Sequence, residues 1–592
     1  MQNYCYSHED TIPKSGELLR IYLRIPHKII TFALTNKSKQ DMRKKLLFLS
    51  LWAATTLMAA DATLQWQSSL LPPADNKCQA IGYDIRTNNE GNAFLLANYG
   101  SINTADETTF LGQTLTGAEY GTGNSYNPNL VFTKVDASGN PLWVIHSSEG
   151  YFVGGTYCPT SDGGAVLAVK FRLTEKNKQP SATAPYMTLV DAAGKTHSLS
   201  AAFKDVNFHR IVLVRVDAKG LITQVTPVWT SQAIPAKSDK PAYDVADITA
   251  VMEDENGNLY LQGGQAMNIA LGTDTIRARK NPDWDGNSFS EHCNSFIIKT
   301  DAQFHHLAHT TTASTLLYDR FMLSAYHDGA IFVTGHAKAD SLGGTLQWGK
   351  QQVSIKDRCI VIARLNSDLT CTHLNALRQV RFSSLGGMFK QLTWAPNGTH
   401  LYMSGSIIGG LVFNGDTLRG GSDEKGSFND GLLLQIDAAT ATVTHATLLH
   451  GKALNVNIGT VSFNDTLYTL NYVFGNIHLT CYDRQLQSVG TISLAKGGGQ
   501  STATGIALYG RNLWIGTRAH GGTDFTIGNQ TLNLAPQWYA TLSGWQLTGN
   551  MPSGIDTPAV TAPDKAQKVI IDGKLYIRRG NQLFNALGQL QN

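Results

Sequence analysis

The clearest copy of a pattern repeated along this chain lies between residues 92 and 146. It begins with Asn92-Ala93-Phe94-Leu95-Leu96-Ala97-Asn98-Tyr99 and continues, after a gap, with Asn129-Leu130-Val131-Phe132-Thr133-Lys134-Val135-Asp136, Ala137-Ser138-Gly139-Asn140 and Pro141-Leu142-Trp143-Val144-Ile145-His146. Apolar residues at every second place are typical of β-strands, and the Ala-Ser-Gly-Asn segment has the composition of a tight turn. The stretch therefore predicts strands joined by a hairpin.

This strand–turn–strand sequence pattern, which we call the repeated phrase, recurs along the chain. Its copies span approximately residues 79–148, 151–230, 244–313, 320–380, 386–449, 453–495 and 502–543. The seventh copy lacks its final strand, while a solitary strand at 63–70 precedes the first copy. Seven four-stranded antiparallel sheets predict an all-β fold, a seven-bladed β-propeller whose closure protects the sheet edges. We expect the strand at 63–70 to complete the seventh blade and close the ring.

Composition agrees with a closed array of repeats. The chain has 592 residues, of which 56 are Gly and only 16% are charged. Thr, Asn, Tyr and Val are plentiful, which favours strands and turns over helices. We expect the propeller to occupy residues 62–548.

The first sixty residues have the pattern of a leader. A basic start at Met42-Arg43-Lys44-Lys45 is followed by an apolar run from Leu46 to Met58 and by the small residues Ala59-Ala60. This order is typical of a secretory signal peptide, so we treat residues 1–60 as a leader with Met42 as the true start. The chain is then expected to be exported, to the cell surface, the extracellular space or the periplasm.

Removing the leader changes the charge balance. The leader holds nine of the 48 Lys and Arg residues and four of the 45 Asp and Glu residues, which leaves the remainder with a net charge of about −2. No basic stripe with interleaved aromatic residues is present, so we expect no nucleic-acid partner. The remainder has six cysteines, which permit either disulfides or buried free thiols: Cys78, Cys158, Cys293, Cys359, Cys371 and Cys481.

The repeated phrase resembles a seven-bladed propeller repeat family of secreted bacterial proteins. The resemblance is best at Asn258 to Gly263, at Ala330 to Gly335 and from Asn129 to Trp143, where a Gly-ended strand and a turn followed by Trp are found. It implies a propeller fold and export, and it carries no catalytic residues.

The C-terminal end differs in composition from the repeats. Residues 549–566 are rich in Gly, Pro, Ala and Thr and predict a linker. Residues 567–592 predict a few short strands, and they resemble the C-terminal sorting tail that Bacteroidota use in type IX secretion. That resemblance implies that this small β tail contacts the export machinery.

The long inter-strand segments indicate a binding face. In a four-stranded meander, the second-to-third and blade-to-blade connections share one face, and here they include 100–128, 172–207 and 264–293. Binding residues concentrate on such loops. Tyr120, Tyr126 and Trp284 lie on them and are candidate residues for stacking on sugars. A smaller echo, an apolar residue and a Gly with a second apolar residue three or four places past the Gly, recurs in five long segments: Leu111-Gly112, Leu271-Gly272, Trp348-Gly349, Phe413-Asn414-Gly415 and Ile527-Gly528.

Other constellations do not predict a reaction. His305 and His306 are adjacent on a predicted strand and point to opposite faces, and Asp283 to Asn287 lacks the later acids of a Ca²⁺ loop, so we expect no metal. Asp136 to Trp143 is similar to an aspartate box with one residue too many, and its Asp is better explained by turn capping. No nucleophile, phosphate-loop or dinucleotide motif is present, and no cofactor is expected.

Two functions from different classes follow, besides a third reading as a structural surface module without a small ligand. The first is a non-catalytic, monomeric binding module that holds a protein or glycan on the long-segment face. The second is a propeller-type polysaccharide hydrolase or lyase, with acids contributed by loops near the axis.

Overall fold

The structure is a computed structural model of the chain. It describes residues 19–25, 28–34, 61–70, 78–101, 107–116, 129–172, 187–199, 210–230, 246–278, 294–380, 389–419, 430–449, 455–463, 466–473, 475–497, 502–520, 525–532, 538–548, 567–571, 574–579, 582–585 and 590–591. By contacts the chain divides into two units, Met1–Ala59 and Ala60–Asn592. Strands and turns make up the described residues, among which no helix is found that has the length and apolar character to cross a bilayer.

The first unit contains one described hairpin. Its strands are β1 (Leu19–Ile25) and β2 (Lys28–Leu34), which pair antiparallel. The predicted signal peptide at residues 42–60 lies outside the described residues, as does the predicted linker at 549–566.

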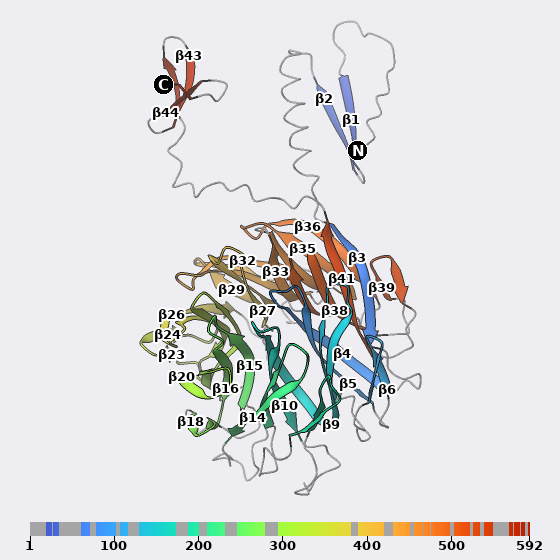
Figure 1. Ribbon diagram of the computed structural model, residues 1–592. Helices are drawn as coiled ribbons and strands as arrows, with labels where there is room; N and C mark the ends of the chain where they lie inside the picture. The colour runs from blue at the N-terminus through green and yellow to red at the C-terminus, as the bar shows by residue number, and fades with distance from the viewer. Residues whose placement is uncertain are drawn as a thin grey trace. The chain divides into compact units, whose positions relative to one another are not determined.

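The second unit contains a seven-bladed β-propeller, as the repeats predict (Figure 1). The innermost strand of each blade contacts the innermost strand of the next, and the seventh contacts the first, so the ring is closed. Four-stranded antiparallel blades can form this ring because each buries both of its faces against its neighbours.

Blades 1 to 4 follow one another along the chain. From the axis outward their strands are β4 (Cys78–Thr87), β5 (Ala93–Ser101), β8 (Asn129–Val135) and β9 (Pro141–Pro159) in blade 1; the end of β9, then β10 (Ala165–Arg172), β13 (Arg210–Val216) and β14 (Ile222–Thr230) in blade 2; β15 (Ala246–Glu253), β16 (Leu259–Gln265), β19 (Asn294–Thr300) and β20 (His306–Ser314) in blade 3; β21 (Tyr318–His327), β22 (Ala330–Lys338), β25 (Arg358–Asn366) and β26 (Cys371–Val380) in blade 4.

Blades 5 to 7 complete the ring. Their strands are β27 (Phe389–Trp394), β28 (His400–Ile407), β31 (Asp430–Asp437) and β32 (Val443–Leu449) in blade 5; β33 (Asn455–Phe463), β34 (Thr466–Val473), β35 (Asn476–Tyr482) and β36 (Ser488–Lys496) in blade 6; β37 (Thr502–Tyr509), β38 (Asn512–His520), β41 (Trp538–Thr548) and β3 (Asp61–Leu70) in blade 7. One difference from the sequence prediction is β9, which runs continuously for 19 residues through the connection between blades 1 and 2.

The N-terminal strand closes the ring as predicted. β3 pairs antiparallel with β41 from Asp61 opposite Thr548 to Leu70 opposite Ala540, and Figure 1 shows these two strands side by side although they come from opposite ends of the propeller sequence. The Trp66 indole also donates to the Ala137 carbonyl at 2.9 Å, so the strand contacts blade 1 as well. Strand pairing and a side-chain contact thus join the seventh blade to the first.

The hydrophobic cores lie between blades. Seven clusters of buried apolar side chains are described, each formed by two neighbouring blades. The cluster between blades 1 and 2, for example, packs Phe132 against Trp143 and Tyr157, with ring centroids 5.4 and 5.1 Å apart. The smallest of the seven lies between blades 5 and 6 and contains only six fully buried residues. Each blade is therefore held by its neighbours rather than by a core of its own.

The five echoes in the long segments are the turns of small hairpins. Each echo Gly has a positive φ, between 59° and 85°, which only Gly adopts without strain. The hairpins pair with or contact the outermost strand of the preceding blade, and a sixth hairpin in blade 2 does the same. They are β6 (Glu107–Phe110) and β7 (Gln113–Thr116), β11 (Met187–Val190) and β12 (Thr196–Ser198), β17 (Ile269–Leu271) and β18 (Asp274–Ile276), β23 (Gly344–Trp348) and β24 (Gln351–Ile355), β29 (Gly410–Phe413) and β30 (Asp416–Arg419), and β39 (Phe525–Ile527) and β40 (Gln530–Leu532).

Four cysteines are described as free thiols, which is the second of the two alternatives that the sequence left open. Burial raises the pKa of Cys158, Cys371 and Cys481 to about 12, so these thiols are inert at neutral pH. The side chains of Cys78 and Cys293 lie outside the described residues.

The C-terminal tail forms a four-stranded sheet. Its strands are β42 (Gln567–Ile571), β43 (Lys574–Arg579), β44 (Gln582–Asn585) and β45 (Leu590–Gln591), each paired antiparallel with the next.

Candidate functional site

The Asp residues of the repeated phrase cap turns, as predicted. Asp136 Oδ1 accepts from the backbone N–H groups of Ser138 and Asn140 at 2.8 and 2.9 Å. The same arrangement recurs at Asp217, where the donors are Lys219 and Leu221. These carboxylates are therefore used to stabilise tight turns on the face opposite the long segments, which we call the turn face.

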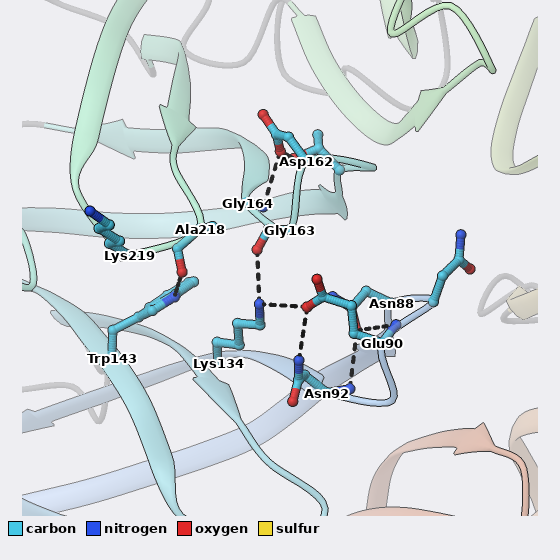
Figure 2. Close-up of polar contacts among 12 residues, drawn as sticks. Asn88, Glu90, Asn92, Lys134, Trp143, Asp162, Gly163, Gly164, Ala218 and Lys219 are labelled. Atoms are coloured by element: carbon cyan, nitrogen blue, oxygen red, sulfur yellow. Dashed lines mark hydrogen bonds and ion pairs between the residues drawn. The ribbon is translucent and has the colours of Figure 1, made fainter.

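Near several turns, a long polar side chain of one blade donates a hydrogen bond to a backbone carbonyl of the next blade. Lys134, whose side chain is 5% exposed, donates to the Gly163 carbonyl of blade 2 at 3.0 Å and to Glu90 Oε2 at 3.2 Å (Figure 2). Its ammonium holds the pKa of the Glu90 carboxyl below the usual value. Residues in the same position of other blades also donate to a carbonyl of the next blade, and we call them clasp residues: Arg215 to Ala302, Lys299 to Ser367, Arg364 to Ala438 and Gln435 to Arg484.

The Trp residues of the phrase have a similar role. Trp143 Nε1 donates to the Ala218 carbonyl of blade 2 at 3.1 Å, as Figure 2 shows, and Trp66 makes the equivalent bond to Ala137 of blade 1. A Cβ at Gly220 would lie 2.6 Å from the Trp143 ring. The repeated Asp, Lys and Trp thus serve the ring, and the candidate site must be sought among residues that do not repeat.

We expect Lys134→Met to lower the free energy of unfolding by about 2 kcal/mol, because the buried Gly163 carbonyl loses its donor. Methionine keeps the apolar stem, so the packing loss is small. Lys219→Met is the matched control, since Lys219 is an exposed lysine on the same face of the neighbouring blade. Urea unfolding of the two variants measures the difference, and equal stability of the two would contradict a structural role for Lys134.

The sequence-predicted ligand residues lie outside the described part of the chain. This holds for Tyr120, Tyr126 and Trp284, and also for the Asp283 to Asn287 segment. The described parts of the long segments are largely the hairpins that extend neighbouring blades. The great length of these segments is therefore explained in part by the scaffold and is not by itself a sign of ligand binding.

The histidines of blade 3 do separate, but the predicted strand from Phe304 to His309 is wrong at its start, because residues 301–305 form a turn, with Phe304 at a φ of 64°, and β20 begins only at His306. His305 Nδ1 lies 2.7 Å from Asp301 Oδ2, apart from His306. A bulge at Leu307 in β20 places His306 on the side of His309, with Nε2 and Nδ1 3.0 Å apart. Across the described ranges no group of three or more ligating side chains is found.

Every innermost strand carries a β-bulge at the same level. One residue of each is left without a partner on the second strand, and these residues are Gly82, Val153, Thr249, Met322, Lys390, Ile458 and Thr504. Innermost strands border the axis, and a bulge re-aims the residue that it inserts. Val153 is 38% exposed although it is apolar and innermost. Lys390 is the one charged residue among the seven.

Charged residues near the starts of innermost strands or the ends of second strands occur on four consecutive blades, and Lys390 is the last of them; we call this set the cationic arc. Lys170 Nζ of blade 2 lies 3.9 Å from Asp247 Oδ2 of blade 3, and Arg320 Nη2 of blade 4 lies 3.6 Å from the same oxygen. The arc then continues through His336, the partner of Arg320 in β22, which stacks on Phe389 of blade 5 at 4.0 Å. Lys390 follows Phe389 directly.

The arc lies at the long-segment end of the channel, because its members are at the starts of innermost strands and the ends of second strands. It combines three cations, Lys170, Arg320 and Lys390, with one carboxylate, Asp247. Lys390 is exposed to solvent, yet surrounding protein atoms lower the pKa of its ammonium through desolvation.

Sequence reasoning missed this arc. Aligning the copies on their innermost strands would have placed Asp247 and Arg320 at one position, but Lys170 lies on a second strand and Lys390 is itself a bulge residue. The bulges that direct them leave little trace in the sequence. The one trace is a Gly on the second strand opposite the bulge, such as Gly335, whose Cβ would lie 2.0 Å from the Arg320 carbonyl.

Comparisons with known proteins bear on the fold alone. No family model matches the chain, and no curated protein matches its sequence. Solved structures with similar folds include a protein of unknown function from Dyadobacter fermentans (11% identity, TM-score 0.36, 82% of this chain and 99% of that chain) and the Dos1 propeller (10%, 0.36, 83% and 96%). The polysaccharide lyase Uly1 is another (8%, 0.37, 82% and 99%). At these identities and scores no activity is transferred to this chain.

Proposed function

We propose that this chain is an exported, non-catalytic binding module that holds an acidic protein or glycan at the long-segment mouth of its channel. The observation that carries the proposal is the cationic arc, where Lys170 and Arg320 both lie within 4 Å of the Asp247 carboxylate and Lys390 follows on the next blade. Positive groups set in a concave, protein-walled opening attract anions more strongly than the same groups on a flat surface. Carboxylate, sulfate or phosphate groups would form charge-assisted hydrogen bonds there.

The state of Asp247 favours binding over catalysis. Its Oδ2 lies within 4 Å of both Lys170 and Arg320, which favours the ionised form. A general acid must carry a proton, and a general base must be free to take one, so a carboxylate held by two cations suits neither task. Its better role is to fix the two cations at a spacing that a ligand recognises.

Export is part of the proposal. It is supported by the leader pattern at Met42 to Ala60 and by the tail at residues 567–592, whose four strands form a sheet. Fractionation of cells that produce the full chain, followed by N-terminal sequencing, tests it. We expect the exported form to begin close to Asp61, and a cytosolic chain that retains Met42 would contradict export.

We expect Lys390→Gln to weaken binding of an acidic polymer about tenfold, because one charge-assisted contact is lost. The probes are polygalacturonate and polyglutamate, with neutral dextran as the uncharged comparison, and the measurement is calorimetric titration at two salt concentrations. Binding to the acidic probes should weaken with salt. Preference for polygalacturonate would identify a glycan ligand, and preference for polyglutamate a protein one.

Lys219→Gln is the control, because it removes the same charge from an exposed turn on the opposite face. The proposal predicts no change in that variant. Equal binding of dextran and the acidic probes, or equal loss in the two variants, would contradict binding at the channel mouth.

A further inference from the structure

The contact between blades 5 and 6 differs from the other inter-blade contacts. Its buried apolar cluster is the smallest of the seven described, and Gln435 is the one neutral residue among the five clasp residues, the others being Lys or Arg. At this contact, on the turn face, lies a depression of about 290 Å³. Its polar lining includes Asn397, Thr399, His400, His445, Arg484 and Gln485. This size is at the lower end of small-molecule sites, which begin at about 300 Å³.

The hydrogen bonds around His445 fix its tautomer. Gln435 Nε2 donates to the Arg484 carbonyl at 3.1 Å, which orients the amide so that its oxygen faces His445 Nδ1 at 2.6 Å. An amide oxygen only accepts, so His445 must carry its proton on Nδ1. The neutral ring therefore has its lone pair on Nε2, and none of the described residues donates to that nitrogen.

The same reasoning applies to His400. Asn397 Oδ1 accepts from the backbone N–H of Thr399 at 3.1 Å and from its hydroxyl at 2.8 Å. Because that hydroxyl has used its one hydrogen, it accepts from His400 Nδ1 at 2.7 Å. The lone pair of His400 is thus also on Nε2. Burial lowers the pKa of His400, with Asp437 opposing and His445 and Arg484 adding to the effect, so the ring is neutral at pH 7.

The lining combines acceptors and donors in one small space. The two imidazole Nε2 atoms require a donor, whereas the Arg484 guanidinium and the amide of Gln485 supply donors. Among the described lining residues there is no carboxylate, and the guanidinium disfavours a metal ion or an ammonium group. A hydroxyl group suits both requirements, because it donates one hydrogen bond and accepts others.

We infer that this depression binds a neutral sugar residue, whose adjacent hydroxyl groups donate to His400 and His445 and accept from Arg484 and Gln485. The site is separate from the cationic arc, since it lies on the opposite face and its ligand is uncharged. A sugar residue also matches the small volume, which leaves no space for a folded segment of a partner protein.

Saturation-transfer NMR on the full chain with glucose, galactose, mannose and N-acetylglucosamine tests the inference. We expect at least one of these sugars to bind, and binding to weaken about tenfold in His400→Ala and in His445→Ala. His305→Ala is the matched control, because that imidazole is 76% exposed on the same face. Lys390→Gln should bind the sugar like the wild type, which separates this site from the channel mouth.

A second measurement needs no variant. Long-range ¹H–¹⁵N correlation spectra of the unmodified protein should show Nδ1 of both histidines protonated, and the bound sugar should shift the two Nε2 resonances. Absence of binding by all four sugars, unchanged Nε2 resonances, or loss of sugar binding in Lys390→Gln would overturn the inference.

Discussion

Deletion of residues 61–70 is expected to abolish the closed ring. The deletion removes the outermost strand of blade 7, with nine residues paired opposite β41, and it exposes the edge of β41 to solvent. It also removes the Trp66 bond to Ala137, which connects blade 7 to blade 1. We expect a loss of more than about 5 kcal/mol, enough to end cooperative folding of many proteins.

Size-exclusion chromatography and thermal unfolding monitored by circular dichroism measure this effect. The deleted chain should aggregate, because an unpaired strand edge pairs with other chains, and it should lack a single unfolding transition. A synthetic peptide covering residues 60–71 should restore the transition when added in excess, and the same peptide with Trp66→Ala should restore less. A deleted chain that unfolds like the intact protein would contradict closure by β3.

Gly335→Ala is expected to destabilise the protein by about 3 kcal/mol. The added Cβ would lie 2.0 Å from the Arg320 carbonyl oxygen and 2.4 Å from Phe321 Cα, and both are backbone atoms that cannot rotate away. The innermost strand must therefore move at its bulge. Because Arg320 belongs to the cationic arc, the same substitution should also weaken binding of polygalacturonate.

Gly490→Ala is the matched control for this substitution. Gly490 also lies within a strand, β36, but nothing lies within 4 Å of the Cβ that alanine would add. Urea unfolding should therefore show a change below about 0.5 kcal/mol for Gly490→Ala. A comparable loss in both variants would show that the effect comes from removing glycine and not from the close approach at the bulge.

The fold could be predicted from the sequence because it depends on a repeated local pattern. Alternating strands, turn residues and a solitary strand at 63–70 are all visible in a single chain, and together they predict both the number of blades and the closure. The bulges could not be predicted, because a bulge inserts one residue into a strand whose pattern already varies. The sequence also could not predict that the echoes form hairpins extending the preceding blade, since that pairing is a tertiary contact.

The candidate site was less accessible to sequence reasoning. The aromatic residues Tyr120, Tyr126 and Trp284 were chosen for their place on long segments, and they remain predictions. The cationic arc depends on contacts between residues one repeat apart, and the depression at His445 depends on how one amide, Gln435, is oriented. Hydrogen-bond directions of this kind arise only when strands far apart in the sequence have been placed next to each other.

A disulfide across the closing strands measures whether β3 pairs with β41. Thr63 lies opposite Gln546 in the β3 and β41 pair, and both side chains are exposed. In the Thr63→Cys and Gln546→Cys double variant, mild oxidation should link the two residues and make the denatured chain migrate faster in gel electrophoresis. The control pair, Thr63→Cys with Val489→Cys on the outer strand of blade 6, should remain unlinked. Closure by the N-terminal strand predicts a near-complete link in the first variant alone, and failure to link, or equal linking in both variants, would contradict it.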